Sequence, residues 1–253
     1  MENSELFKYI DHTQLKAYCT WEDIRTLCQE ALTYHTASVC IPPSYVSRVR
    51  DAFGPSLNIC TVIGFPLGYH TTGTKIQETR QAILDGAREI DMVINIADVK
   101  NKDFEKVYEE IAALRETAKD EILKVIVETC YLTESEKIRL CEIVTKAGAD
   151  YIKTSTGFGT GGAVMEDILL FKEHIGPSVK IKAAGGIRTR DDLEAFIEAG
   201  CSRIGTSSAV RLLCPQRYCN QNDPRHRRFN YLFQCQARDI LSCIQAHADR
   251  RCN

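Results

Sequence analysis

The feature that most constrains the fold of this chain is a regular alternation of strand-like and helix-like segments over its first 213 residues. Eight short runs rich in β-branched and apolar residues are each followed by a helix-like segment. No linker rich in Pro, Gly or Ser separates any two of them. The pattern predicts one α/β domain, a (β/α)8 TIM barrel, and periodicity leaves a doubly wound open sheet as the main alternative.

The limits of these elements follow from prolines and helix caps. Pro42 and Pro43 stop the second strand, and Thr20 or a residue near it can cap the first long helix. Residues 133–136 have the spacing of a capping box. The predicted strands are 9–13, 38–41, 58–63, 89–94, 123–128, 149–154, 179–184 and 203–205. The predicted helices are 21–34, 45–53, a segment beginning after residue 73, 104–118, 133–147, 165–174, 190–199 and one that begins at Ser207.

Length and composition narrow the class of protein. A chain of 253 residues is long enough for one large barrel, and a net charge of −2 argues against general nucleic-acid binding. Residues 1–5 are acidic, and no apolar run reaches the roughly 18 residues of a membrane span, so we expect a cytoplasmic protein. The chain has 12 cysteines, and those in the first 213 residues lack paired spacing, which favours buried free thiols.

Lys153 is an unusual residue for its position, because it interrupts an apolar strand near the strand's C-terminal end. In a parallel barrel that end opens onto the site, where a desolvated lysine beside a second cation can present a neutral amine to a carbonyl. Lys182 on the next strand is the predicted neighbour, and Lys180 is the alternative on the same side. A lysine that reaches solvent or pairs with an acid is the competing explanation.

Asp91 is a carboxylate within another apolar strand. It can pair with the two amines and move protons between substrate and water, or it can form a plain ion pair. The barrel interpretation has a testable consequence, since polar residues at strand ends should converge on one face. Besides those already named, the residues concerned are Asp11, Cys40, Asn95, Lys124 and Glu128.

Glycines and hydroxyls follow the last strands and predict an anion site. Gly185 and Gly186 follow the seventh strand, and Ser207 and Ser208 follow the eighth and begin a helix. Backbone N–H groups can approach a phosphate closely at such positions. Further glycines from the sixth loop, residues 157, 159, 161 and 162, would add to it.

Several phrases of the sequence together resemble the deoxyribose-phosphate aldolases, a family of class I, lysine-dependent enzymes. The phrases occur in the family's order between residue 9 and about residue 213. They are IDHT (10–13), CTVIGFPLG (60–68), EIDMVIN (89–95), KVIVET (124–129), YIKTSTG (151–157), KAAGGIRT (182–189) and GTSS (205–208).

The resemblance implies a carbon–carbon lyase that cleaves 2-deoxy-D-ribose 5-phosphate reversibly to D-glyceraldehyde 3-phosphate and acetaldehyde. Lys153 would form the Schiff base, Lys182 would keep the pKa of Lys153 low, and Asp91 would work with Lys182 as the acid–base pair. The imine serves as electron sink, so no metal and no cofactor are implied. By position, the phosphate and pocket residues would be Gly157, Gly185, Gly186, Ser207 and Ser208, with Thr156, Asp11, Cys40 and Lys124 lining the pocket.

The chain departs from this family after about Leu213. Residues 214–253 contain five cysteines, seven arginines and no lysine, and 229–246 has the apolar spacing of a helix. We expect a barrel over 1–213 and an atypical tail over 214–253. A frame-shifted or foreign C-terminus explains the tail better than a zinc site formed by Cys214, Cys219, His226 and Cys235 does.

Alternatives to this function come from two classes. A lysine aldolase acting on a ketose phosphate would place a different carbonyl in the imine. A phosphosugar-binding protein without turnover would keep the phosphate site, although it would not need two amines in one apolar pocket. The expected partners are a small phosphosugar and acetaldehyde, with no nucleic acid and no membrane, and the resemblance allows a homodimer.

Overall fold

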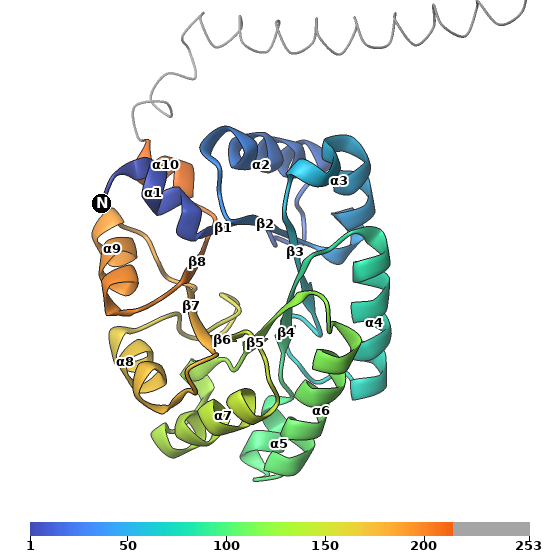
Figure 1. Ribbon diagram of the computed structural model, residues 1–253, viewed down its shortest axis with the longest axis vertical. Helices are drawn as coiled ribbons and strands as arrows, with labels where there is room; N and C mark the ends of the chain where they lie inside the picture. Colours follow the sequence, from blue (N-terminus) through green and yellow to red (C-terminus); the bar gives the residue numbers. More distant parts are fainter. Residues whose placement is uncertain (215–253) are drawn as a thin grey trace, which may run out of the picture. The chain divides into compact units, whose positions relative to one another are not determined.

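The strands pair in the order in which they occur in the chain, and the eighth closes on the first (Figure 1). The computed structural model describes residues 1–214. All neighbouring pairs are parallel, and β1 meets β8 through Ile10 opposite Ile204, which excludes the open sheet. The strands are β1 (Ile10–Thr13), β2 (Ser38–Ile41), β3 (Ile59–Ile63), β4 (Glu89–Val93), β5 (Ile122–Ile126), β6 (Tyr151–Lys153), β7 (Lys180–Ala184) and β8 (Arg203–Thr206).

Helices cover the outside of the barrel (Figure 1). They are α1 (Asn3–Leu6), α2 (Trp21–Tyr34), α3 (Val46–Phe53), α4 (Thr72–Asp85), α5 (Ile96–Lys100), α6 (Phe104–Thr117), α7 (Glu134–Lys146), α8 (Met165–His174), α9 (Arg190–Ala199) and α10 (Ala209–Leu213). Four 3-10 turns complete the set: η1 (Phe7–Tyr9), η2 (Pro43–Tyr45), η3 (Gly54–Ser56) and η4 (Thr129–Tyr131).

The predicted helix starts are confirmed by their hydrogen bonds. Thr20 and Asp23 form a capping box at α2, and Thr133 and Glu136 form one at α7. The short helix α5 was not predicted, because five residues are too few for a periodic apolar pattern. Asn95, predicted to lie with the site residues, instead caps α5 by accepting a hydrogen bond from a backbone N–H.

The end of β5 differs from the prediction. We expected a strand over 123–128, but β5 ends at Ile126. Glu128 adopts a left-handed conformation with φ 55° and ψ 66°, which a strand cannot contain. The backbone therefore turns at this residue.

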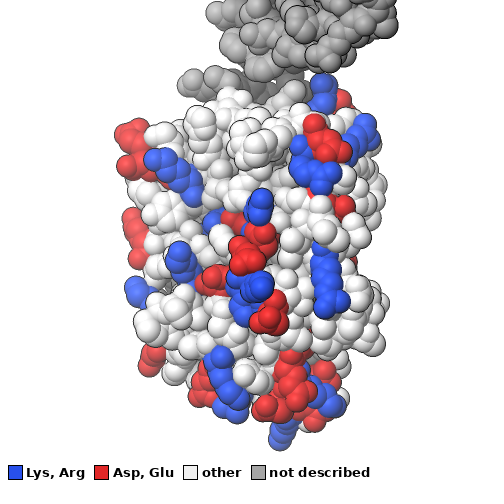
Figure 2. All heavy atoms as spheres, turned by 45° about the vertical axis from the view of Figure 1, so that its right-hand side comes forward, with Lys and Arg blue, Asp and Glu red and all other residues white. Residues whose placement is uncertain are grey.

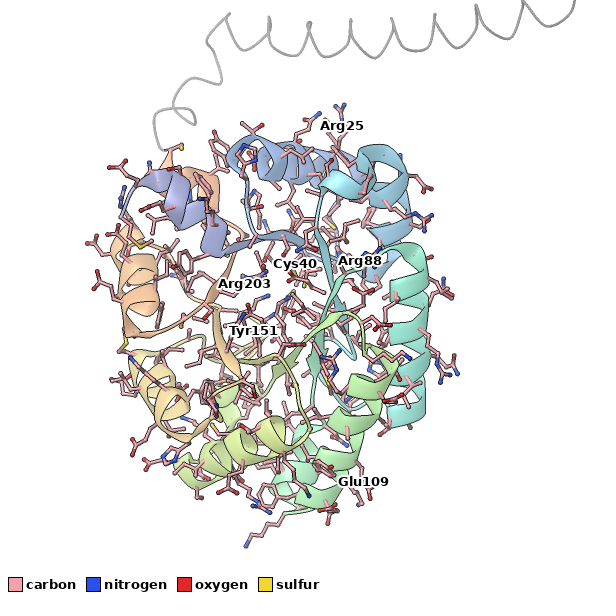
Figure 3. The ribbon with its side chains drawn as sticks, in the orientation of Figure 1. Arg25, Cys40, Arg88, Glu109, Tyr151 and Arg203 are labelled. Carbon is pink, nitrogen blue, oxygen red and sulfur yellow. The ribbon has the colours of Figure 1, made fainter. Side chains whose placement is uncertain are left out.

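The two faces of the barrel wall differ in chemistry. Ile90, Val125 and Ile152 alternate along their strands with charged residues and pack outward beneath the helices. The interior carries charged side chains instead of the branched apolar residues that usually fill such barrels. Cys40, Tyr151 and Arg203 lie inside the ring of strands, whereas Arg25 and Glu109 lie on the outer helices (Figure 3).

The surface carries both signs of charge. On the face shown in Figure 2, lysines and arginines alternate with aspartates and glutamates. Within residues 1–214, every helix is too short or too polar to traverse a bilayer. Residues 1–212 form one compact unit. The predicted helix over 229–246 lies outside the described residues.

Candidate active site

Lys153 ends β6, and its position follows from the sheet register. It lies opposite Lys182 on β7 and opposite Ile126 on β5. Lys153 is 3% exposed and lines the main cavity of the described part of the chain. The Nζ atom lies 2.7 Å from Asp91 Oδ2. The predicted pairing of Lys153 with Lys182 is confirmed; Lys180 is exposed, with its amine over the Tyr151 ring.

Asp91 lies at the centre of the buried amines. Its Oδ2 accepts hydrogen bonds from Lys153 and, at 2.6 Å, from Lys182, and its Oδ1 accepts one from Lys124 at 2.8 Å. Burial alone would raise the pKa of Asp91, but the cations of Lys124, Lys153 and Lys182 outweigh it and hold the pKa well below its usual range. Asp91 is therefore a carboxylate throughout the physiological range.

Asp91 belongs to a larger buried charge cluster inside the barrel. Lys124 also contacts Glu89 at 2.6 Å, and Arg203 contacts Glu89 at 2.9 Å. Lys182 lies 2.5 Å from Asp11, which Arg203 also contacts. The cluster consists of Asp11, Glu89, Asp91, Lys124, Lys153, Lys182 and Arg203. The cluster thus brings four basic side chains together with three acidic ones in the barrel interior.

The amines differ in how firmly the carboxylates hold them. Burial would lower the pKa of Lys182, but the charges of Asp11 and Asp91 raise it above its usual value. Burial would likewise lower the pKa of Lys124, which Asp91 and its other anionic neighbours raise well above that value. Lys153 contacts one carboxylate, the fewest in the cluster, and it alone of the three lysines lines the cavity. Lys153 is thus the amine best placed to react.

A cavity of about 360 Å³ opens above Lys153. Six predicted binding residues line it, and the structure brings them together from three loops: Thr156, Gly157, Gly185, Gly186, Ser207 and Ser208. Sequence reasoning did not single out three cationic residues in the same wall, Lys16, Arg188 and Arg211. Arg188 lies within the phrase 182–189, and Lys16 and Arg211 each follow a phrase by three residues, so their closeness to the motifs was the available signal.

Asp11, Cys40 and Lys124 do not line the cavity, contrary to expectation. All three are fully buried, within the barrel interior. The error has a physical reason: a strand position fixes which face a side chain joins but does not fix its depth along the tilted barrel. Asp11 and Lys124 belong to the charge cluster, and Cys40 packs with Cys60 and Val62.

The glycines of the cavity wall are needed for their backbone conformation and for space. Gly185 and Gly186 have φ of 80° and 77°, and Gly157 has φ of 85°, values that glycine adopts without strain. These three residues form what we call the glycine cradle. A Cβ atom on Gly162 would lie 2.3 Å from the Gly185 carbonyl oxygen, so the sixth loop packs directly against the cradle.

The helix start after β8 contributes less than predicted. The backbone N–H of Ser208 donates to Thr206 Oγ1 at 3.1 Å and is therefore already engaged. The helix that follows, α10, has five residues, so its dipole is small. Ser208 instead accepts a hydrogen bond from Arg211 through its hydroxyl, which places that guanidinium at the cavity wall.

Among residues 1–214, two groups of buried residues have the ligand types of a metal site. Cys40, Cys60 and Asp91 form one, and Asp11, Cys60 and Glu89 form the other, with ligand atoms within 4.8 Å of one another in each. The Lys124 ammonium already lies 3.2 Å from Cys60 Sγ and contacts the carboxylates of both groups. That amine occupies the place where an ion would have to bind. Of the tail residues considered for zinc, all but Cys214 lie outside the described residues.

Comparisons with known proteins agree with this geometry. A profile of the DeoC/LacD family aldolases matches residues 6–210. The deoxyribose-phosphate aldolase of Clostridium botulinum (strain Alaska E43 / Type E3) is 64% identical over 213 residues, which cover 84% of this chain and 96% of that protein. The enzyme of the same name from Clostridioides difficile (strain 630) is 58% identical over 208 residues, covering 82% and 95%.

A solved structure supports the same assignment. The deoxyribose phosphate aldolase of Aeropyrum pernix, described as tetrameric, matches with a TM-score of 0.79 and 32% identity, over 84% of this chain and 91% of that one. The family profile, the curated relatives and the barrel thus cover the same part of the sequence. This chain belongs to the DeoC/LacD family of aldolases.

Proposed function

We propose that this protein is a deoxyribose-phosphate aldolase, which cleaves 2-deoxy-D-ribose 5-phosphate reversibly to D-glyceraldehyde 3-phosphate and acetaldehyde. The observation that carries the proposal is the place of Lys153, at the floor of a cavity with its amine 2.7 Å from a buried carboxylate that a second lysine also contacts. The close relatives that bear this name support the same reaction.

The reaction begins when Lys153 Nζ gives up a proton to water and, as the neutral amine, attacks the C1 aldehyde of the open-chain sugar. Loss of water gives a protonated imine, and removal of the C3 hydroxyl proton breaks the C2–C3 bond. The bonding electrons move into the iminium and leave an enamine on Lys153, while D-glyceraldehyde 3-phosphate departs. Protonation at C2 and addition of water then release acetaldehyde and restore the amine.

Asp91 and Lys182 supply the proton transfers in this proposal, acting through a water molecule. The cluster keeps Asp91 ionised and Lys182 protonated, so the pair offers an acceptor and a donor side by side. The iminium also keeps the positive charge of the ammonium it replaces. Asp91 can therefore stay paired with Lys153 through imine formation.

The charge of the cavity supports a phosphorylated substrate. Four cationic side chains line the cavity and no carboxylate of the described residues does. Lys16, Arg188 and Arg211 make no ion pair within 4 Å among residues 1–214, whereas the surface cations Arg25 and Lys100 pair with Glu22 and Glu136. Unpaired cations beside a glycine cradle are suited to a phosphate monoester.

The oligomeric state, the location and the origin of the tail are separate predictions. The Aeropyrum pernix relative is described as tetrameric, and a mass measurement in solution distinguishes a tetramer from the predicted homodimer. The cytoplasmic location and the foreign origin of residues 214–253 also stay predictions. Light scattering measures the oligomeric state. The intact mass, compared with the coding frame, tests the origin of residues 214–253.

The test is a coupled assay of D-glyceraldehyde 3-phosphate release from 2-deoxy-D-ribose 5-phosphate. The wild type should turn over, and Lys153→Leu should not, although it should still bind the sugar phosphate. Retained turnover in Lys153→Leu would refute the assignment. Cleavage of a ketose phosphate in preference to the deoxy sugar would favour the other lysine aldolase, and binding with no product from the wild type would favour a binding protein.

A further inference from the structure

Glu128 is a buried acid that the reaction described above does not use. We propose that Glu128 is a positioning residue, which fixes the loop after β6 and so holds the glycine cradle in place for the phosphate of the substrate. The inference rests on the proposed function and names a residue that controls how tightly that site binds.

The backbone around Glu128 joins the loops that follow β5 and β6. The N–H of Val127 donates to the Lys153 carbonyl at 3.1 Å, and the N–H of Thr129 donates to the Thr154 carbonyl at 2.9 Å. Glu128 lies between them in the left-handed region, with φ 55°. A residue other than glycine costs roughly 1–2 kcal/mol in this conformation. The turn aims its side chain toward the neighbouring loop.

The Glu128 carboxylate determines the conformation of the turn that begins at Thr156. It accepts hydrogen bonds from the Thr156 backbone N–H, at 3.2 and 3.3 Å to its two oxygens, and another from the Thr156 hydroxyl. The Thr156 hydroxyl oxygen in turn accepts a hydrogen bond from the N–H of Phe158 at 3.0 Å. A single buried side chain thus fixes three consecutive residues, and all three line the cavity.

Glu128 differs from the other buried acids in how its charge is compensated. It is 2% exposed and has no ion-pair partner within 4 Å among the described residues. Burial raises its pKa, while the hydrogen bonds of Thr156 and the charge of Lys153 lower it. The other buried acids of residues 1–214 are all in ion pairs: Asp11, Glu89, Asp91, Glu110 and Asp167. The main contacts of this carboxylate are therefore its hydrogen bonds with Thr156 and not an ion pair.

Close packing carries the effect from this loop to the cradle. A Cβ on Gly185 would lie 3.4 Å from the Gly157 Cα, and one on Gly159 would lie 3.1 Å from the Glu128 carboxyl group. The N–H of Ala163 also donates to the Gly185 carbonyl at 3.1 Å. The loop fits between the carboxyl group and the cradle with no spare space. A shift of the Thr156 turn would therefore move Gly157 relative to Gly185.

The test compares three substitutions at this position. Glu128→Ala and Glu128→Asp withdraw the carboxylate from Thr156 and should raise the KM for deoxyribose 5-phosphate at least about tenfold, as expected for lost charge-assisted hydrogen bonds. Glu128→Gln keeps the shape and an acceptor for the Thr156 N–H and should keep KM within about threefold. Tyr131→Phe, a change at an exposed residue of the same loop, serves as the control and should match the wild type.

A second readout separates positioning from chemistry and from a general loss of structure. Acetaldehyde has no phosphate, so borohydride trapping of acetaldehyde on Lys153 should proceed normally in all four variants. Inorganic phosphate should bind more weakly to Glu128→Asp than to the wild type in calorimetric titrations. That titration decides the inference even if the wild type shows no aldolase activity.

The inference fails if Glu128→Asp, shown to be folded by its thermal transition, keeps the wild-type KM and phosphate affinity. It also fails if the trapping of acetaldehyde on Lys153 decreases as KM increases, because Glu128 would then act on the imine itself. Equal damage in Glu128→Gln and Glu128→Ala would likewise overturn it.

Discussion

Replacing Lys182 by methionine tests the buried charge cluster most sharply. The substitution keeps an unbranched side chain that is one atom shorter and removes the ammonium that lies 2.6 Å from Asp91 Oδ2. General acid–base groups contribute typically 10²–10⁴-fold to a rate, about 3–5 kcal/mol of barrier, and we expect kcat for sugar cleavage to fall by that factor. The fold should survive. Asp91 keeps Lys124 at 2.8 Å and Lys153 at 2.7 Å, and Asp11 keeps Arg203.

The matched control for this substitution is on the same strand. Lys180→Met removes an equal charge two residues earlier, from an exposed amine over the Tyr151 ring, and kcat should stay unchanged. Both variants are compared in the coupled assay, with thermal unfolding as the check on folding. The reasoning is refuted if Lys182→Met keeps kcat within tenfold of the wild type, or if Lys180→Met loses as much.

Three further predictions concern stability, binding and pH. Lys75→Met leaves the buried Glu110 without its cation and should lower the unfolding free energy by about 3–5 kcal/mol in urea titrations. Adding Glu110→Leu to this variant should recover most of that loss. A double variant as unstable as the single variant would contradict this prediction. Arg211→Gln should weaken phosphate binding roughly three- to tenfold in low-salt calorimetry, and Arg80→Gln on the exposed surface should not. Burial raises the pKa of Asp91, but the surrounding lysines lower it by more, so it lies well below the usual 3.8. The contribution of Asp91 to stability is therefore complete above pH 3.8 and is lost as the pH falls through the lower pKa of the folded state. Asp91→Asn should flatten acid unfolding in that range, and an unchanged acid transition would refute this.

Much of the fold could be predicted because local patterns and global structure agree in this chain. Strands buried on both faces give continuous apolar runs, and hydroxyl–acid pairs mark the helix starts, as at Thr20 and Thr133. The five-residue helix α5 and the left-handed turn at Glu128 were missed. Both depend on tertiary contacts: a short helix needs few apolar residues, and nothing local requires a glutamate to adopt a glycine-like conformation.

The neighbours of Lys153 could be predicted better than the cavity wall. The choice of Lys182 over Lys180 was correct because parallel register sets Lys153 opposite Lys182. The depth of Asp11 and the presence of Arg211 in the cavity could not be read from spacing. Depth depends on strand tilt and stagger, and a guanidinium at the end of a long side chain can reach a site from several positions.

The most direct test of the central claim is borohydride reduction of the protein in the presence of acetaldehyde, followed by peptide mass mapping. Reduction converts an imine into a stable amine. The account predicts an added two-carbon group on the peptide that contains Lys153, and none in Lys153→Leu. Folded protein that acquires no such group, or that acquires it on another lysine, would contradict the claim that Lys153 is the nucleophile.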